Sequence, residues 1–152
     1  MPTIIIETLI NAPAERCFDL ARDIGLHCQT TSNTKERVVA GVTSGLIELG
    51  QSVTFEAVHF GVRQQLTSRI VEFEKPKIFV DEMTKGIFAS MRHVHEFETR
   101  GKSTLMRDTV TWQSPLGILG VIADGLFLKR YMARFIAERN AALKQIAETK
   151  MT

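Results

Sequence analysis

Hydrophobic and polar residues alternate with a period of two along the middle of the chain. Residues 51–60 show this clearly: valine, phenylalanine, alanine and histidine at positions 53, 55, 57 and 59 share one face, and serine, threonine and glutamate at 52, 54 and 56 share the other. Such alternation predicts β-strands with one face turned toward a core. Together with β-branched content, it predicts strands at residues 3–10, 38–39, 51–60, 62–74, 78–84, 88–98 and 103–113.

Short breaks separate these strands. The breaks contain glycine or proline, as in Phe60-Gly61, Lys75-Pro76, Lys85-Gly86 and Arg100-Gly101-Lys102. Strands about 10–15 residues apart with tight connections indicate an antiparallel meander rather than βαβ units. A sheet of this kind packs one face on a core and leaves the other to solvent.

Three segments have helical features. Pro13, placed at a first helical position with Glu15 in the first turn, predicts a short helix. Residues 23–33 form a second short element. From about Val121 to Thr149 an apolar stripe recurs at helical spacing, and the charged residues between its members are predicted to form the solvated side. The stripe is Leu128, Met132, Phe135, Ile136, Leu143 and Ile146; the charged residues are Lys129, Arg130, Arg134, Glu138, Arg139 and Lys144.

These elements predict an α+β architecture. A terminal helix of roughly 25 residues is about 40 Å long and is the only element able to cross the inner face of the sheet. A strongly twisted sheet does not close flat onto a helix, so space for a small ligand remains between them. The chain has 152 residues, of which 44% are hydrophobic and 24% charged, and it is interpreted as one domain spanning residues 1–152.

The composition narrows the classes of function. A net charge of +2 gives no sign of nucleic-acid binding. No stretch approaches the roughly 20 apolar residues of a membrane span, and the start of the sequence lacks the features of a signal peptide, so the expected compartment is the cytoplasm. Cys17 and Cys28 are interpreted as reduced thiols. A homodimer is left open.

A set of short motifs is spread over the whole chain. They are His59-Phe60-Gly61, Pro76 with Phe79-Val80-Asp81, Gly86-Ile87-Phe88, Arg92-His93-Val94-His95-Glu96-Phe97, Asp108, and Pro115-Leu116-Gly117 with Gly120. With the order of elements, they resemble the START-like, or helix-grip, superfamily, which includes the birch-pollen allergen, polyketide cyclases and coenzyme-Q-binding proteins. The similarity is greatest to small bacterial polyketide-cyclase-like proteins. Met91 stands where such relatives often have an aromatic residue.

The resemblance implies a curved antiparallel sheet wrapped around the long C-terminal helix, with two short helices after the first strand. It also implies a cavity that binds a hydrophobic or amphipathic small molecule such as a lipid, a quinone or a polyketide-like aromatic. The predicted apolar walls are Phe55, Leu66, Phe79, Met91, Phe97, Trp112, Leu128, Met132 and Phe135. The predicted polar contacts are His59, Gln64, His93 and His95.

His93, His95 and Asp108 form a candidate catalytic group. Alternation places His93 and His95 on the same inward face as Phe97, and the hairpin makes Asp108 a cross-strand neighbour of one of them. We therefore expect His95 and Asp108 to be coupled. Such a group satisfies buried polar atoms, orients a ligand head, or supplies a general acid–base pair for a cyclase- or hydratase-type enzyme.

Other chemistries are less well supported by the sequence. His-x-His with Asp108 as a third ligand resembles part of a zinc site, but neither a CxxC nor an HExxH motif accompanies it, so no metal and no cofactor is predicted. Nucleophile and phosphate-loop motifs are absent. A remaining alternative is an interaction protein that docks a partner through the outer sheet face or through Lys129, Arg130 and Arg134.

Overall fold

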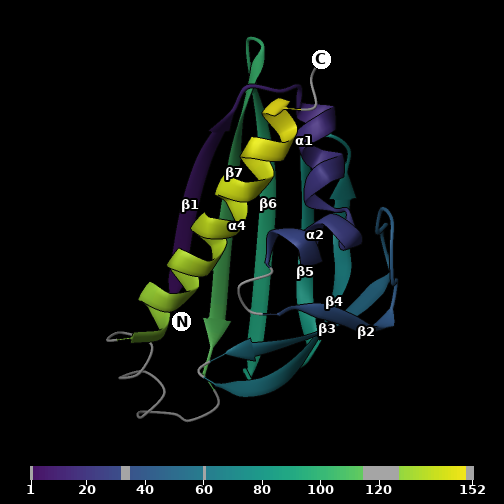
Figure 1. Cartoon of the computed structure of the whole chain (residues 1–152), viewed down its shortest axis with the longest axis vertical. Coiled ribbons are helices and arrows are strands. Elements are labelled where there is room, and N and C mark those ends of the chain that lie inside the picture. Colours follow the sequence, from purple (N-terminus) through teal and green to yellow (C-terminus); the bar gives the residue numbers. More distant parts are fainter. Residues whose placement is uncertain (1, 32–34, 60, 115–126, 150–152) are drawn as a thin grey trace.

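The computed structural model describes residues 2–31, 35–59, 61–114 and 127–149. Its largest element is one antiparallel sheet in the order β1-β7-β6-β5-β4-β3-β2, and helices pack on the concave side of this sheet (Figure 1). The strands are β1 (Thr3–Ile10), β2 (Arg37–Gly41), β3 (Ser52–His59), β4 (Val62–Glu74), β5 (Ile78–Lys85), β6 (Ser90–Arg100) and β7 (Ser103–Gln113). The predicted meander from β3 to β7 is confirmed.

The curvature of the sheet has a local cause in the pairing of β4 with β5. The register shifts between Thr67 and Ser68, which leaves Thr84 of β5 unpaired, and between Ile70 and Glu72, which leaves Val71 of β4 unpaired. Each bulge bends its strand. By contrast, β6 and β7 pair without a register shift over their whole length, from the Ser90–Gln113 pair to the Arg100–Ser103 pair. This part of the sheet is therefore regular.

The two short helices follow β1, as predicted. Helix α1 (Ala14–Ala21) begins one residue later than expected, because Pro13 has extended backbone angles and is the N-cap. Helix α2 (Ile24–Thr30) is capped by Asp23, whose carboxylate accepts a hydrogen bond from the Leu26 amide at 3.1 Å.

The terminal helix α4 (Lys129–Thr149) crosses the concave face of the sheet (Figure 1). Its 21 residues make it about 32 Å long. The predicted helical residues 121–126 and the Pro115–Gly120 motif lie outside the described residues. Within the described part of the chain, no helix is long and apolar enough to span a membrane.

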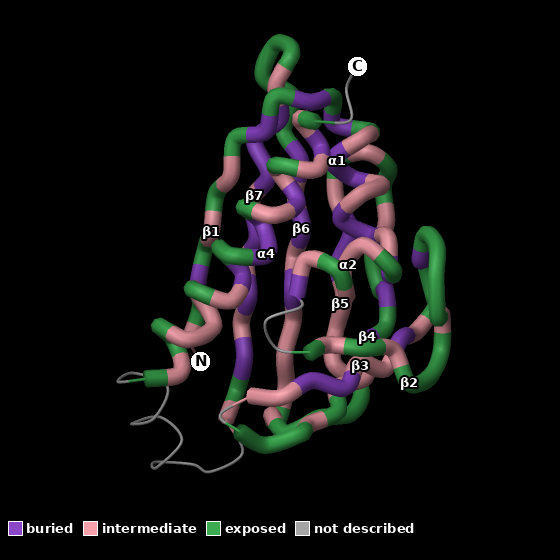
Figure 2. Tube along the Cα trace, in the orientation of Figure 1, coloured by how far each residue is buried: buried purple, intermediate pink, exposed green. Residues whose placement is uncertain are grey.

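Among the described residues, the buried hydrophobic side chains form two clusters. Figure 2 shows the buried stretches of the chain. The larger cluster centres on Phe18 of α1, whose ring meets those of Phe73, Phe79 and Phe97 edge-on at 5.2–5.3 Å. The smaller cluster contains Trp112 under α4. The concave face is therefore packed in two places rather than along its whole length.

Candidate functional site

A cavity of about 200 Å³ lies between the concave face of the sheet and helices α2 and α4. Most of the sequence-predicted site residues line it, from strands β3 to β6 and from the terminal helical segment. The predicted residues on its wall are Phe55, His59, Gln64, Leu66, Phe79, Met91, His93, His95, Leu128, Met132 and Phe135.

Two predicted wall residues lie elsewhere. Phe97 packs against Phe18 in the larger cluster, and Trp112 is fully buried in the smaller one. Both are on the inward face, as alternation predicts. Alternation predicts the face of a strand but not which part of that face a helix covers. Here α1 covers Phe97 and α4 covers Trp112, so neither residue reaches the cavity.

His93 and Asp108 form a buried hydrogen-bonded pair. Asp108 lies opposite His95 in the β6–β7 register, but the His93 ring reaches diagonally across and its Nε2 lies 2.7 Å from Asp108 Oδ1. His95 Nδ1 is 3.3 Å from the same oxygen without the direction of a good hydrogen bond. The expected His95–Asp108 coupling is thus an electrostatic contact, and the direct hydrogen bond belongs to His93.

His95 makes its hydrogen bond to Asp81, a residue that sequence reasoning did not assign to the site. Its Nε2 lies 2.7 Å from Asp81 Oδ2, again diagonally, because Asp81 is the register partner of His93. The rings of His93 and His95 stack at 3.7 Å, and Phe79 stacks on the other side of His95 at 4.1 Å. This stack fixes the planes of both imidazoles.

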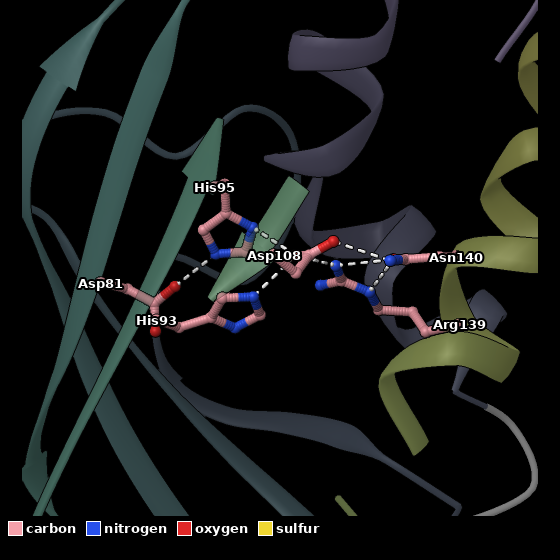
Figure 3. A network of polar contacts seen from close by, with 6 residues as sticks. All are labelled: Asp81, His93, His95, Asp108, Arg139 and Asn140. Atoms are coloured by element: carbon pink, nitrogen blue, oxygen red, sulfur yellow. Dashed lines mark hydrogen bonds and ion pairs between the residues drawn. The ribbon is translucent and has the colours of Figure 1, made fainter. Parts of the chain in front are cut away.

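Helix α4 completes the network from the opposite side of Asp108 (Figure 3). Arg139 Nη2 donates to Asp108 Oδ1 at 3.0 Å and Asn140 Nδ2 donates to Oδ2 at 2.7 Å. The prediction that Arg139 belongs to the solvated side of the helix is wrong, since it is 4% exposed. A charged residue stays at this depth because the carboxylate of Asp108 neutralises it.

Burial and charge pull the pKa values of this network in different directions. Burial alone would raise the pKa of Asp108, but Arg139 and the two histidines hold it well below its usual range. Burial also opposes ionisation of Asp81, yet the hydrogen bond from His95 lowers its pKa. Burial and the neighbouring His95 lower the pKa of His93 to about 4, despite Asp108. For His95 the two carboxylates outweigh burial and raise the pKa.

These shifts assign the protons at the end of the cavity. A neutral His93 has one ring proton, and because Nε2 faces ionised Asp108, the proton resides there and Nδ1 is a bare acceptor. Asp81 offers a second acceptor, since only its Oδ2 bonds His95. Asp81, His93 and His95 also present three potential metal-ligand atoms within 4.8 Å of one another.

A second pair of polar contacts lies on the cavity wall away from this network. The His59 ring hydrogen-bonds the hydroxyl of Tyr131 on α4, and His27 of α2 hydrogen-bonds Glu36. Burial lowers the pKa of His59. Tyr131, His27 and Glu36 line the cavity but were not predicted, because their proximity depends on how the helices dock.

The similarity of this chain to known proteins lies in its fold. No protein-family model matches it, and no curated protein matches it. Solved structures do. Protein TTHA0849 from Thermus thermophilus superimposes with a TM-score of 0.81 at 19% identity, covering 99% of this chain and 100% of that one. A START superfamily protein from Mycobacterium smegmatis gives 0.74 at 14% identity and 97% of each chain.

A plant protein has the same arrangement. Ginseng major latex-like protein 151 from Panax ginseng gives a TM-score of 0.73 at 13% identity, over 96% of this chain and 97% of that one. The chain has the START-like helix-grip fold. The fold predicted from the sequence is therefore confirmed. At these identities the comparison concerns the arrangement of the START-like backbone and not the site.

The two adjacent histidines should titrate differently. In a ¹⁵N NMR titration, we expect His93 to show the Nε2–H tautomer and to gain its second proton with a pKa of about 4. His95 should stay protonated to a higher pH than the ordinary 6.5. His93→Gln assigns the signals. A His93 that titrates near 6.5 would contradict the buried network.

Proposed function

We propose that this chain binds a small hydrophobic or amphipathic molecule in the cavity between the sheet and α4. The observation that carries the proposal is a lining in which many apolar side chains surround a few polar groups. The network of Asp81, His93, His95 and Arg139 lies at one end, and the His59–Tyr131 and His27–Glu36 pairs lie elsewhere on the wall. An apolar wall with a few convergent polar groups is the usual composition of a small-molecule site. Burial of the ligand body would supply most of the affinity, at about 25 cal/mol per Å².

The size of the cavity narrows the class of ligand. Drug-sized ligands occupy about 300–1,000 Å³, whereas a cavity of about 150 Å³ holds benzene. The volume of about 200 Å³ therefore favours a body of one or two rings, such as a quinone head or a polyketide-like aromatic, over a long-chain lipid.

The polar end favours a hydroxyl on that ring. His93 Nδ1 and the free oxygen of Asp81 are acceptors, so they would each match an O–H or N–H donor of the ligand. An uncompensated buried acceptor costs about 1–3 kcal/mol. A ring that lacks a donor should bind correspondingly less tightly than its hydroxylated form.

The direct test is to identify what the purified protein carries. Extraction with organic solvent followed by mass spectrometry should reveal an aromatic or quinone-like compound, released only on unfolding. If the extract is empty, one- and two-ring phenols should still shift the NMR signals of residues on the cavity wall. The proposal would be refuted if no compound is bound and no phenol shifts these NMR signals.

Filling the cavity should weaken binding. Ala57 is buried on β3 and lines the cavity, so Ala57→Leu places three further carbons inside it. We expect the affinity for 2-naphthol, measured by calorimetry, to fall at least tenfold, or about 1.4 kcal/mol. The matched control is Ala40→Leu at an exposed position of β2, which should leave affinity unchanged. Equal affinities in the two folded variants would place the ligand elsewhere.

A cyclase- or hydratase-type enzyme is the second candidate, favoured by the His93–Asp108 pair. A base held by a carboxylate beside a substrate cavity is an arrangement used for proton abstraction. However, general bases work best with pKa values near the operating pH, and His93 has a pKa of about 4, so binding is favoured. Turnover of a phenolic or polyketide-like substrate that is lost in His93→Gln, with binding retained, would reverse this order.

A further inference from the structure

We propose that Asp81, His93 and His95 bind a divalent transition-metal ion at the polar end of the cavity. In the described part of the chain, each of these residues offers one potential ligand atom, and the three atoms lie within 4.8 Å of one another. Figure 3 shows the three side chains together. The proposal rests on this geometry and does not require that a small molecule binds.

Two adjacent strands hold the three ligands on one face. His93 and His95 are two residues apart in β6 and therefore point to the same side. Asp81 is the direct register partner of His93 in β5, which brings its carboxylate beside both rings. Phe79 and the stacked imidazoles restrict rotation of the rings. Ligands on paired strands are held more rigidly than ligands on loops.

The surroundings of the two histidines are those of metal ligands. A metal-bound histidine almost always donates its other ring N–H to a carboxylate, a carbonyl or water. Here His93 Nε2 hydrogen-bonds Asp108 Oδ1 at 2.7 Å. His95 Nδ1 is 3.3 Å from the same oxygen, an electrostatic contact without the direction of a hydrogen bond. Arg139 and Asn140 in turn hold Asp108. His93 Nδ1 and His95 Nε2 remain for the ion.

The three side chains would have to adjust to accept the ion, since their ligand atoms lie within 4.8 Å of one another. Metal bonds of about 2.0–2.2 Å place two ligands of a tetrahedral site about 3.3 Å apart. His95 Nε2 and Asp81 Oδ2 are now 2.7 Å apart and share a proton, so they would separate by roughly half an ångström as the ion takes that position. Binding would therefore release the proton that His95 donates to Asp81.

The donor set points to the metal class. Two imidazoles and one carboxylate are typical of zinc and non-haem ferrous sites, whereas Mg²⁺ and Ca²⁺ prefer oxygen ligands. Three protein ligands leave an open position directed into the cavity. Asp81, Asp108 and Arg139 together have one negative charge, which a divalent ion converts to one positive charge. The open position thus favours an anionic oxygen, such as an ionised phenol or enol.

The test is metal binding by the intact chain after treatment with a chelator. We expect one Co²⁺ or Zn²⁺ per chain by calorimetry and elemental analysis, with Mg²⁺ not competing. Asp81→Asn, His93→Gln and His95→Gln should each lower the affinity at least about 100-fold, the upper end of the loss caused by outer-shell changes. The matched control is Glu82→Gln, which removes an ion pair with Arg92; its affinity should stay within about threefold of the unaltered chain.

A measurement on the unaltered protein removes the question of folding. Paramagnetic Co²⁺ should shift the NMR signals of β5 and β6 around Asp81, His93 and His95 before those of any other segment. The proposal is overturned if no ion binds stoichiometrically, or if the ion shifts another segment instead. It is also overturned if the three variants, shown to be folded by circular dichroism, bind as tightly as the control. Phenol binding measured separately, with and without the ion, tests the proposed function independently.

Discussion

Replacing Asp108 with alanine is expected to lower the free energy of unfolding by about 3–5 kcal/mol, the range for breaking a buried ion pair. Asp108 is fully buried and accepts hydrogen bonds from His93, Arg139 and Asn140 at 2.7–3.0 Å. Without it, the buried Arg139 guanidinium loses the carboxylate to which it is hydrogen-bonded, and only the electrostatic interaction with Asp81 remains to offset its charge. Urea denaturation followed by circular dichroism, with chelator present to exclude any contribution from a metal ion, measures the loss.

The matched control is a more exposed ion pair that also involves strand β7. Glu7 of β1 pairs with Arg107, the chain neighbour of Asp108, at 2.8 Å, but the Glu7 side chain is 49% exposed. Glu7→Ala should therefore change stability by no more than about 1 kcal/mol. Similar losses in the two variants would mean that Asp108 is not the anchor of the network.

Phe18→Ala is expected to cost about 3–5 kcal/mol through loss of buried surface and the cavity left behind. Phe18 has no exposed surface and its ring meets three other phenylalanine rings edge-on, each such contact contributing about 0.5–1.5 kcal/mol beyond burial. It also joins α1 to strands β4, β5 and β6. The same denaturation experiment measures the effect.

An exposed apolar residue provides the comparison for Phe18. Leu49 is 58% exposed, so Leu49→Ala should change stability by no more than about 0.5 kcal/mol. A Phe18→Ala loss below about 1 kcal/mol would contradict the assignment of this ring to the centre of the larger cluster. The experiment concerns packing alone, since Phe18 is not a lining residue of the cavity.

The network beside the cavity is costly to maintain. Well-packed apolar residues in place of a buried ion pair are often neutral or stabilising by about 1–4 kcal/mol. The structure nevertheless places Asp108, Arg139 and His95 at 4% exposure or less, next to an apolar cavity. Each of the two proposals would give the network a role besides stability: two acceptors for a ligand hydroxyl, or three ligands for a metal ion.

Strand faces could be read from the sequence because side-chain direction alternates locally. The predicted limits of β1 and β7 are those of the structure, and His93 and His95 were placed on the inward face of β6. The start of α2 is set by Asp23, a local cap. These features depend only on the chain's own neighbours, so a single sequence contains them.

The contact partners of the inward-facing residues could be identified only from the tertiary structure. Whether His93 or His95 bonds Asp108 depends on a diagonal reach across two strands, and Asp81 enters the site only through the register of β5 with β6. In the sequence, Arg139 resembles the other charged residues of α4 that lie in solvent. Only the docking of that helix buries Arg139 against Asp108. Local periodicity is enough to predict the strands, the helices and the inward-facing histidines, because it depends only on neighbours in the chain. Which side chains meet can be known only from the folded chain, because contacts between strands and helices depend on register and docking.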